Sequence, residues 1–231
     1  MINTSSITRQ AMYWDNYLEQ QLIIQLERVI RRIKRHGAPD LMPHMGSVFT
    51  LLEKAHRISS AGHIAVQLIE KIHPWPVRWG YADRWLIELK FAEQFLRKKQ
   101  AERRRAELLA HLSDLYLHTR QHDLAVEMGQ AAQVLARQTR SALAYAVGSS
   151  SIVGTLKAIG QHYEAGSVMA QAENELNALH FKSSLIKHAE AAAILSLEKY
   201  DLLRRQGYIE EALRTAGEHI NRIKSFPRPN I

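Results

Sequence analysis

The sequence predicts an all-α protein built as an α-solenoid of about ten helices in antiparallel pairs. Apolar residues recur at three- and four-residue spacing through most of the chain, which is the period of one face of a helix. Helix breakers are few, with 11 glycines and 6 prolines in 231 residues, and they fall between the periodic stretches. From residue 109 onward the order of large and small residues also repeats, which is typical of stacked helix pairs.

The composition excludes several classes of function. The chain has no cysteine, which excludes disulfides, thiolate metal sites, iron–sulfur clusters and thiol nucleophiles. No apolar run approaches the ~20 residues that span a bilayer, and the first residues do not resemble a signal peptide. We therefore expect a cytoplasmic protein that does not enter a membrane. The formal net charge is +8, and most of this excess lies in the N-terminal half of the chain.

The N-terminal region, residues 1–105, is predicted to be helical and basic. Its first helix extends from Ile7 to about His36, with an apolar stripe along one face and charged residues on the other. Gly37 and Pro39 directly follow and end this helix. The result is a long helix with a charged outer face.

Two shorter helices are expected at 46–58 and 63–72, and prolines break the pattern at 73–76. Residues 81–118 contain neither glycine nor proline, but this run is longer than an average helix. We expect a bend or break within 98–105, where polar residues interrupt the apolar stripe, with one continuous helix as the alternative. The two shorter helices also fit a degenerate repeat, marked by Leu51, Leu52, Gly62, Ala65, Ile69 and Ile72.

The repeats are predicted within residues 106–224. In the first helix pair, large residues fill the space between two helices and small residues let the helices approach closely. The residues that carry this pattern are Leu109, Leu112, Ser113, Tyr116, Ala125, Gly129 and Ala132. Their spacing resembles the tetratricopeptide signature. A second copy is marked by Ile152, Leu156, Gly160, Ala165, Met169 and Ala172.

A third, weaker copy includes Leu203, Gly207, Tyr208, Glu210, Glu211, Ala212 and Ala216. It departs from the family at Ser196 and Lys199, where large apolar residues are preferred, and at Tyr200 and His219, where small ones are. We interpret these departures as signs of a terminal, capping unit. Residues 225–231 are predicted to form a disordered tail.

The matched alanines at 125, 165 and 212 are farther apart than the family period of about 34 residues, so the helices must be extended. This long-helix style is similar to the helical-repeat regions of bacterial signalling ATPases and transcription regulators. The resemblance implies a non-catalytic adaptor, scaffold or regulatory subunit that binds a partner protein or peptide in a groove. The partner could be another subunit of a larger assembly or of a homo-oligomer. From helix phase, the residues expected to line the groove are Asp114, His118, Ser150 and Lys157.

Clustered cations form the strongest electrostatic feature of the sequence. They are Arg28, Arg31, Arg32, Lys34 and Arg35 on the first helix, and Arg97, Lys98, Lys99, Arg103, Arg104 and Arg105 farther along. Rows of cations can grip phosphates, so the alternative function is a nucleic-acid-binding subunit. We favour a solvated helix face, because Glu93, Glu102 and Glu107 are close enough in sequence for local pairing.

Three tryptophans, Trp75, Trp79 and Trp85, cluster around the proline-rich turn with Arg78 and Arg84. Such a mixture could stack bases or anchor a partner peptide. We favour a packed hub, because a buried indole needs only one hydrogen-bond partner.

No motif predicts catalysis, a metal or a cofactor. His111, Asp114 and His118 share one helix side, but residues seven apart are separated by ~10 Å along the axis, too far to converge on zinc. Residues 148–155 only superficially resemble a phosphate loop, because no lysine precedes Thr155. No nucleophile elbow, zinc-protease motif or dinucleotide fingerprint occurs. We therefore do not expect an enzyme.

Overall fold

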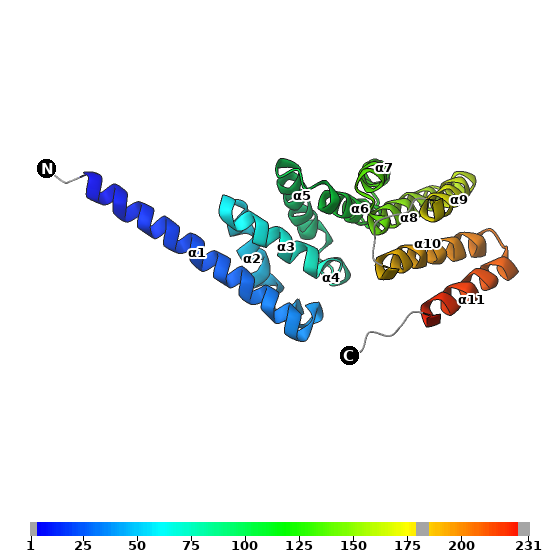
Figure 1. The fold of residues 1–231 in the computed structure, drawn as a ribbon, viewed down its shortest axis with the longest axis horizontal. Coiled ribbons are helices and arrows are strands. Elements are labelled where there is room, and N and C mark those ends of the chain that lie inside the picture. Colours follow the sequence, from blue (N-terminus) through cyan, green and yellow to red (C-terminus); the bar gives the residue numbers. More distant parts are fainter. Residues whose placement is uncertain (1–3, 179–184, 226–231) are drawn as a thin grey trace. The chain divides into compact units, whose positions relative to one another are not determined.

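Eleven α-helices and two short 3-10 helices make up the regular structure of the described residues (Figure 1). The structure, a computed structural model, describes residues 4–178 and 185–225, with side chains for 16–178, 188–218, 220 and 221. No strand occurs in these ranges, so the prediction of an all-α fold is confirmed. The helices pack mainly with their neighbours in sequence, as in a helical-repeat stack. The chain divides into two compact units, 1–95 and 96–231.

The first unit begins with the long charged helix that the sequence predicts. Its elements are α1 Thr4–His36, η1 Ala38–His44, α2 Met45–His56, η2 Ser59–Ala61, α3 Gly62–Ile72, α4 Trp75–Arg78 and α5 Ala82–Lys98. Along α1, Leu22, Leu26 and Ile30 are buried, and the helix packs against η1, α2 and α3. The short helix α4 occupies the proline-rich segment, which the sequence analysis treated only as a break.

Helix α5 joins the core of the first unit through aromatic side chains. Phe49 on α2 makes edge contacts with Trp85, at 6.3 Å between ring centroids. The ring of Phe95 lies so close to Gly62 that an added Cβ would overlap Phe95 Cε2. Only glycine fits at this position, because any side chain would overlap the ring.

The second unit contains residues 106–224, where the sequence predicts the repeats. Its helices, apart from the end of α5, are α6 Glu102–His118, α7 His122–Thr139, α8 Ala142–Ala158, α9 His162–Ala178, α10 Leu185–Arg205 and α11 Ile209–Ser225. The break between α5 and α6 falls inside the predicted range of 98–105. The two compact units meet between residues 95 and 96, so the whole second basic segment belongs to the second unit. Helix α11 includes Ser225, and the rest of the predicted tail lies outside the described residues.

The helices of the second unit pair in order, α6 with α7, α8 with α9 and α10 with α11. The first helices of the pairs also pack on one another, α6 on α8 and α8 on α10. The three matched alanines lie near the start of the second helices, and Ala125, Ala165 and Ala212 are all buried. Their burial between helices agrees with the predicted role of small residues in close packing.

Helices α7 and α8 approach each other closely. Gly129 and Gly148 face each other, and a Cβ added at Gly129 would be 3.0 Å from the carbonyl oxygen of Gly148. The same Cβ would be 2.7 Å from Ile152 Cγ1. On the other side, Ser113 Oγ donates a hydrogen bond of 2.6 Å to the carbonyl oxygen of Ala125. Small residues therefore let the two backbones nearly touch.

One type of turn joins the helices at regular intervals. Gln100, Arg120, Arg140 and Gly160 have positive φ and are spaced by twenty residues. Each of these residues follows a helix. Its N–H and the N–H of the next residue each donate a hydrogen bond back to a carbonyl oxygen of that helix, for example Gly160 N to Lys157 O and Gln161 N to Leu156 O. These are Schellman turns, which satisfy the last carbonyl groups of a helix. Gly207 repeats the geometry between α10 and α11.

In the part of the chain that the structure describes, no helix combines the length and the apolar character needed to cross a membrane.

Candidate interaction surfaces

The first helices of the pairs, α6, α8 and α10, lie side by side, because α6 and α10 both pack against α8. We call the row of partly exposed residues on α8, with Asp114 and His118 on α6 and Leu197 on α10, the first-helix face. On α8 its partly exposed positions are Leu143, Val147, Ser150 and Gly154, which recur at the three- and four-residue spacing of one helix face. On α10, Leu197 is exposed. The face therefore mixes apolar and polar side chains.

On α6, two of the predicted groove residues lie together on this face. Asp114 is partly exposed and His118 is exposed. The two side chains approach each other, with 3.6 Å between His118 Nε2 and Asp114 Oδ2. His111 lies one turn earlier and is partly buried. Burial lowers the pKa of His111 to about 4, so this imidazole is neutral at physiological pH.

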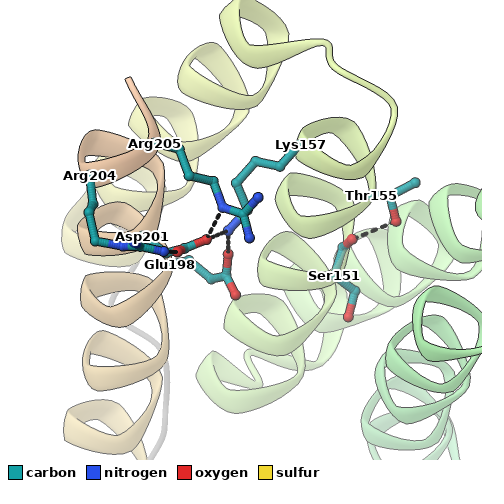
Figure 2. Close-up of polar contacts among 7 residues, drawn as sticks. All are labelled: Ser151, Thr155, Lys157, Glu198, Asp201, Arg204 and Arg205. Atoms are coloured by element: carbon teal, nitrogen blue, oxygen red, sulfur yellow. Dashed lines mark hydrogen bonds and ion pairs between the residues drawn. The ribbon is translucent and has the colours of Figure 1, made fainter. Parts of the chain in front are cut away.

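Lys157, the fourth predicted groove residue, has a different position. Its side chain is only 7% exposed, and Nζ donates to Glu198 Oε2 at 2.6 Å and to Asp201 Oδ2 at 2.8 Å. Figure 2 shows both carboxylates reaching from α10 toward Lys157 on α8. Lys157 therefore joins two helices and is not an open contact for a ligand. Its place on a helix could be predicted from the sequence, but its burial could not.

Two arginines extend the Lys157 cluster toward solvent. Arg204 donates to Asp201 Oδ1 at 3.0 Å, and Arg205 donates to Asp201 Oδ2 at 2.8 Å (Figure 2). Burial alone would raise the pKa of Asp201, but hydrogen bonds from Lys157, Arg204 and Arg205 outweigh burial and hold this pKa below its usual range. Asp201 is therefore ionised at physiological pH, and the cluster holds α10 on α8.

A second ion pair links α7 to α9. Arg137 binds Glu175 through two hydrogen bonds, of 2.6 Å from Nε and 3.0 Å from Nη2. The guanidinium also lies 5.2 Å from the ring centroid of Tyr145. Hydrogen bonding from Arg137 lowers the pKa of Glu175 to about 2, and burial raises the pKa of Tyr145 to about 12. This fixed arrangement suits a structural link rather than proton transfer.

The basic residues of α1 form a shallow cationic hollow of about 470 Å³. Its lining residues are Arg28, Arg31, Arg32, Arg35, His36 and Asp40. Arg31 pairs with Glu27 at 3.3 Å, and Arg32 pairs with Asp40. The hydrogen bond from Arg32 lowers the pKa of Asp40. Arg28, Lys34 and Arg35 are exposed, and none has an ion-pair partner within the described side chains.

The second basic segment lies at the junction of α5 and α6. Arg97, Lys98, Lys99, Arg103 and Arg104 are exposed, whereas Arg105 is partly buried and pairs with Glu102 at 3.3 Å. The local pairing that the sequence favoured is thus present at Arg105. This segment belongs to the second unit, whereas the α1 hollow belongs to the first.

The three tryptophans divide between core and surface. Trp85 is fully buried, and its Nε1 donates to His73 Nδ1 at 3.1 Å, so it is a core residue and not a surface anchor. Trp75 and Trp79 are partly exposed and stacked, with ring centroids 5.9 Å apart, and Arg78 lies over Trp75 at 5.2 Å. For Trp85 the packed hub is the correct interpretation.

One buried carboxylate escaped the sequence analysis. Glu88 on α5 is only 3% exposed and lies 2.8 Å from His56 Nε2. The His56 ring stacks on Phe91 with centroids 4.0 Å apart. These contacts join α2 to α5. No signal marked this pair, because the two residues lie 32 positions apart and each is an ordinary helix residue in sequence.

Comparisons with known proteins identify no family. No protein-family profile matches the chain, and no curated protein is significantly similar to it. Among the described residues, no group of three or more His, Cys, Asp or Glu side chains could hold a metal ion.

Proposed function

We propose that this chain is a non-catalytic interaction subunit, an adaptor or scaffold, that binds a partner protein or peptide on its first-helix face. The observation that carries the proposal is the row of partly exposed residues along α8, between α6 and α10. Stacked helix pairs of tetratricopeptide type present such a continuous surface to helices or extended peptides.

The character of this row fits a peptide contact. Val147 and Leu143 offer apolar area, and Ser150 offers a hydroxyl group, while Asp114 and His118 on α6 lie at the rim. Interfaces with apolar centres and polar rims gain affinity by excluding water from the centre. Lys157 contributes to this surface indirectly, because it keeps α10 in place beside α8.

The experiment compares two substitutions that add the same side chain. Ser150→Arg places a long cation on the first-helix face, whereas Gln130→Arg places one at an exposed position of α7. The tagged full-length chain and both variants are used to recover bound proteins from native lysate, which are identified by mass spectrometry.

The proposal predicts that a specific protein is recovered with the unaltered chain and with Gln130→Arg, but is lost with Ser150→Arg. It is wrong if only nucleic acid is recovered, or if Ser150→Arg retains every protein that the unaltered chain binds. Circular dichroism checks that all three chains are equally helical.

The second candidate function is nucleic-acid binding, which the cationic hollow of α1 favours. Arg28 and Arg35 line this hollow with no ion-pair partner in the described side chains, so they are available to phosphates. Binding of this kind weakens steeply as salt increases. Titrations of duplex and single-stranded DNA should then show a salt slope that falls by about one for each of Arg28→Ala and Arg35→Ala. Arg103→Ala and Arg104→Ala test the other basic segment, and an absent or flat salt response excludes this function.

A further inference from the structure

The short helix α4 carries two tryptophans and an arginine at the surface of the first unit. Trp75 and Trp79 are partly exposed, and their rings stack with centroids 5.9 Å apart. The guanidinium of Arg78 lies 5.2 Å from the centroid of the Trp75 ring, and Arg78 is exposed. Aromatic rings that reach solvent beside a cation are the arrangement on which nucleic-acid bases stack.

This stacked pair lies close to the cationic hollow of α1. Both belong to the first unit, and η1 connects them, because it supplies Asp40 to the hollow and packs against both α1 and α4. Asp40 is the third residue of η1, and a 3-10 helix rises by ~2 Å per residue, so α4 lies within ~20 Å of Asp40. The hollow itself is lined by four arginines, His36 and a single carboxylate. A cationic surface and an aromatic surface therefore flank one short element.

A ligand that uses both surfaces must carry negative charges and flat rings within one short stretch. Single-stranded nucleic acid has both, because its phosphates are charged and its bases are free to stack on aromatic side chains. In a duplex the bases stack on one another, and only their edges are accessible in the grooves. The tryptophan pair therefore favours a single strand, whereas the hollow alone would accept either form.

We propose that the first unit binds single-stranded nucleic acid, with phosphates in the hollow of α1 and bases stacked on Trp75 and Trp79. This assignment rests on the second candidate function, because it needs phosphate binding in the hollow, and it adds the class of nucleic acid. A strand of about 12 nucleotides is ~40 Å long at the ~3.4 Å spacing of stacked bases, which is enough to cover both surfaces. Since every base has a flat face, the strand should bind with little sequence preference.

The first experiment compares strands with and without bases. Fluorescence anisotropy measures binding of the unaltered full-length chain to a labelled DNA strand of mixed sequence, about 12 nucleotides long. An abasic strand of the same length carries the same phosphates but nothing that can stack. The strand with bases should bind at least about fivefold more tightly. Equal affinity for the two strands would overturn the proposal.

The second experiment removes one aromatic face. Trp79→Ala should weaken binding of the single strand by about 5- to 150-fold, without a change in the salt slope or in the affinity for a duplex of the same length. Trp79→Phe keeps an aromatic ring and should retain most of the affinity. Tyr163→Ala is the matched control, because Tyr163 is 87% exposed in the second unit, and it should bind like the unaltered chain. Arg35→Ala should instead reduce the salt slope for both forms of DNA.

The outcomes separate base stacking from nucleic-acid binding in general. If neither DNA form binds, the second candidate function and the single-strand assignment are both wrong. If both forms bind but a folded Trp79→Ala variant binds the single strand as tightly as the unaltered chain does, only base stacking on the tryptophans is overturned. Circular dichroism shows whether this variant is folded. The abasic strand decides the same question with the unaltered chain.

Discussion

Substituting alanine for Gly129 tests whether the helices of the stack depend on small residues for their close approach. The added Cβ would lie 2.7 Å from Ile152 Cγ1, 2.9 Å from Ser113 Oγ and 3.0 Å from the carbonyl oxygen of Gly148. The side-chain atoms can shift, but the Gly148 carbonyl belongs to the backbone of α8 and can move only if the helices separate. Gly129→Ala must therefore force α7 away from α8.

The change in the free energy of unfolding caused by Gly129→Ala is the balance of two opposing effects. Alanine is favoured over glycine inside a helix by about 0.8–1 kcal/mol. Overpacking a well-filled interface costs about 1–3 kcal/mol. The net result should be a loss of about 0–2 kcal/mol. Gly166→Ala on α9 is the matched control, because nothing lies within 4 Å of its added Cβ. There the helix preference acts alone, and the substitution should stabilise the fold by about 0.5–1 kcal/mol.

Urea unfolding can assign the effect to the second unit. Trp75, Trp79 and Trp85 lie in the first unit, and the sequence has no tryptophan after residue 85, so tryptophan fluorescence follows unfolding of the first unit. Far-UV circular dichroism follows helices of both units. We expect Gly129→Ala to lower, and Gly166→Ala to raise, the midpoint of the circular dichroism transition. Equal stabilisation by the two substitutions would refute the argument from close helix approach.

Three further substitutions test other contacts by thermal or urea unfolding. Lys157→Met should destabilise the protein by about 2 kcal/mol, less than the full cost of breaking a buried pair, because Glu198 and Asp201 keep some access to water. Lys71→Met, at an exposed lysine, measures the background, and an equal effect there would contradict the role of Lys157. Glu175→Gln removes a carboxylate whose pKa Arg137 lowers to about 2. The pair stabilises the fold above the unfolded pKa of about 4.3 and loses this stabilisation as pH falls toward 2. The free energy of unfolding of the unaltered chain should thus exceed that of the variant by about 1 kcal/mol at pH 7, a value discounted for partial exposure. This difference should become progressively smaller below pH 4.5. A difference that does not shrink would contradict the role of this ion pair. Arg140→Gly removes the steric cost of a side chain in the left-handed backbone conformation, and it should stabilise the fold by about 0.5–1 kcal/mol. Gly160→Ala introduces this cost at the same place in the next turn, and it should destabilise the fold by about 1 kcal/mol. If both shift unfolding in the same direction, backbone strain does not govern these turns.

Much of the helical architecture could be predicted from periodicity and breakers. The end of the first helix at His36 and the break after Lys98 follow from Gly37 and from a polar interruption in the sequence. The turns at Gln100, Arg120 and Arg140 gave no comparable signal, because they adopt positive φ without glycine. There the backbone hydrogen bonds of the Schellman turn, and not the residue's own preference, determine the conformation.

The candidate surfaces were less predictable than the helices. Helix phase placed Asp114 and Ser150 on partly exposed positions, but it could not show that α10 covers Lys157. That fact depends on Glu198, which lies 41 residues away. Arg137 and its partner are separated by 38 residues, again close to the spacing of the repeats. Opposite charges about one repeat apart are therefore the sequence signal that would have found both links.

The turns at residues 100, 120, 140 and 160 are evenly spaced, so they divide this part of the stack into segments of equal length. The second helices α7 and α9 both begin after a glutamine and with a histidine, at Gln121-His122 and at Gln161-His162. Excising residues 121–160 would bring Arg120 directly before Gln161, recreating the original junction sequence at the start of a helix. An array of this kind can lengthen or shorten by whole helix pairs during evolution, without the redesign of a single connection.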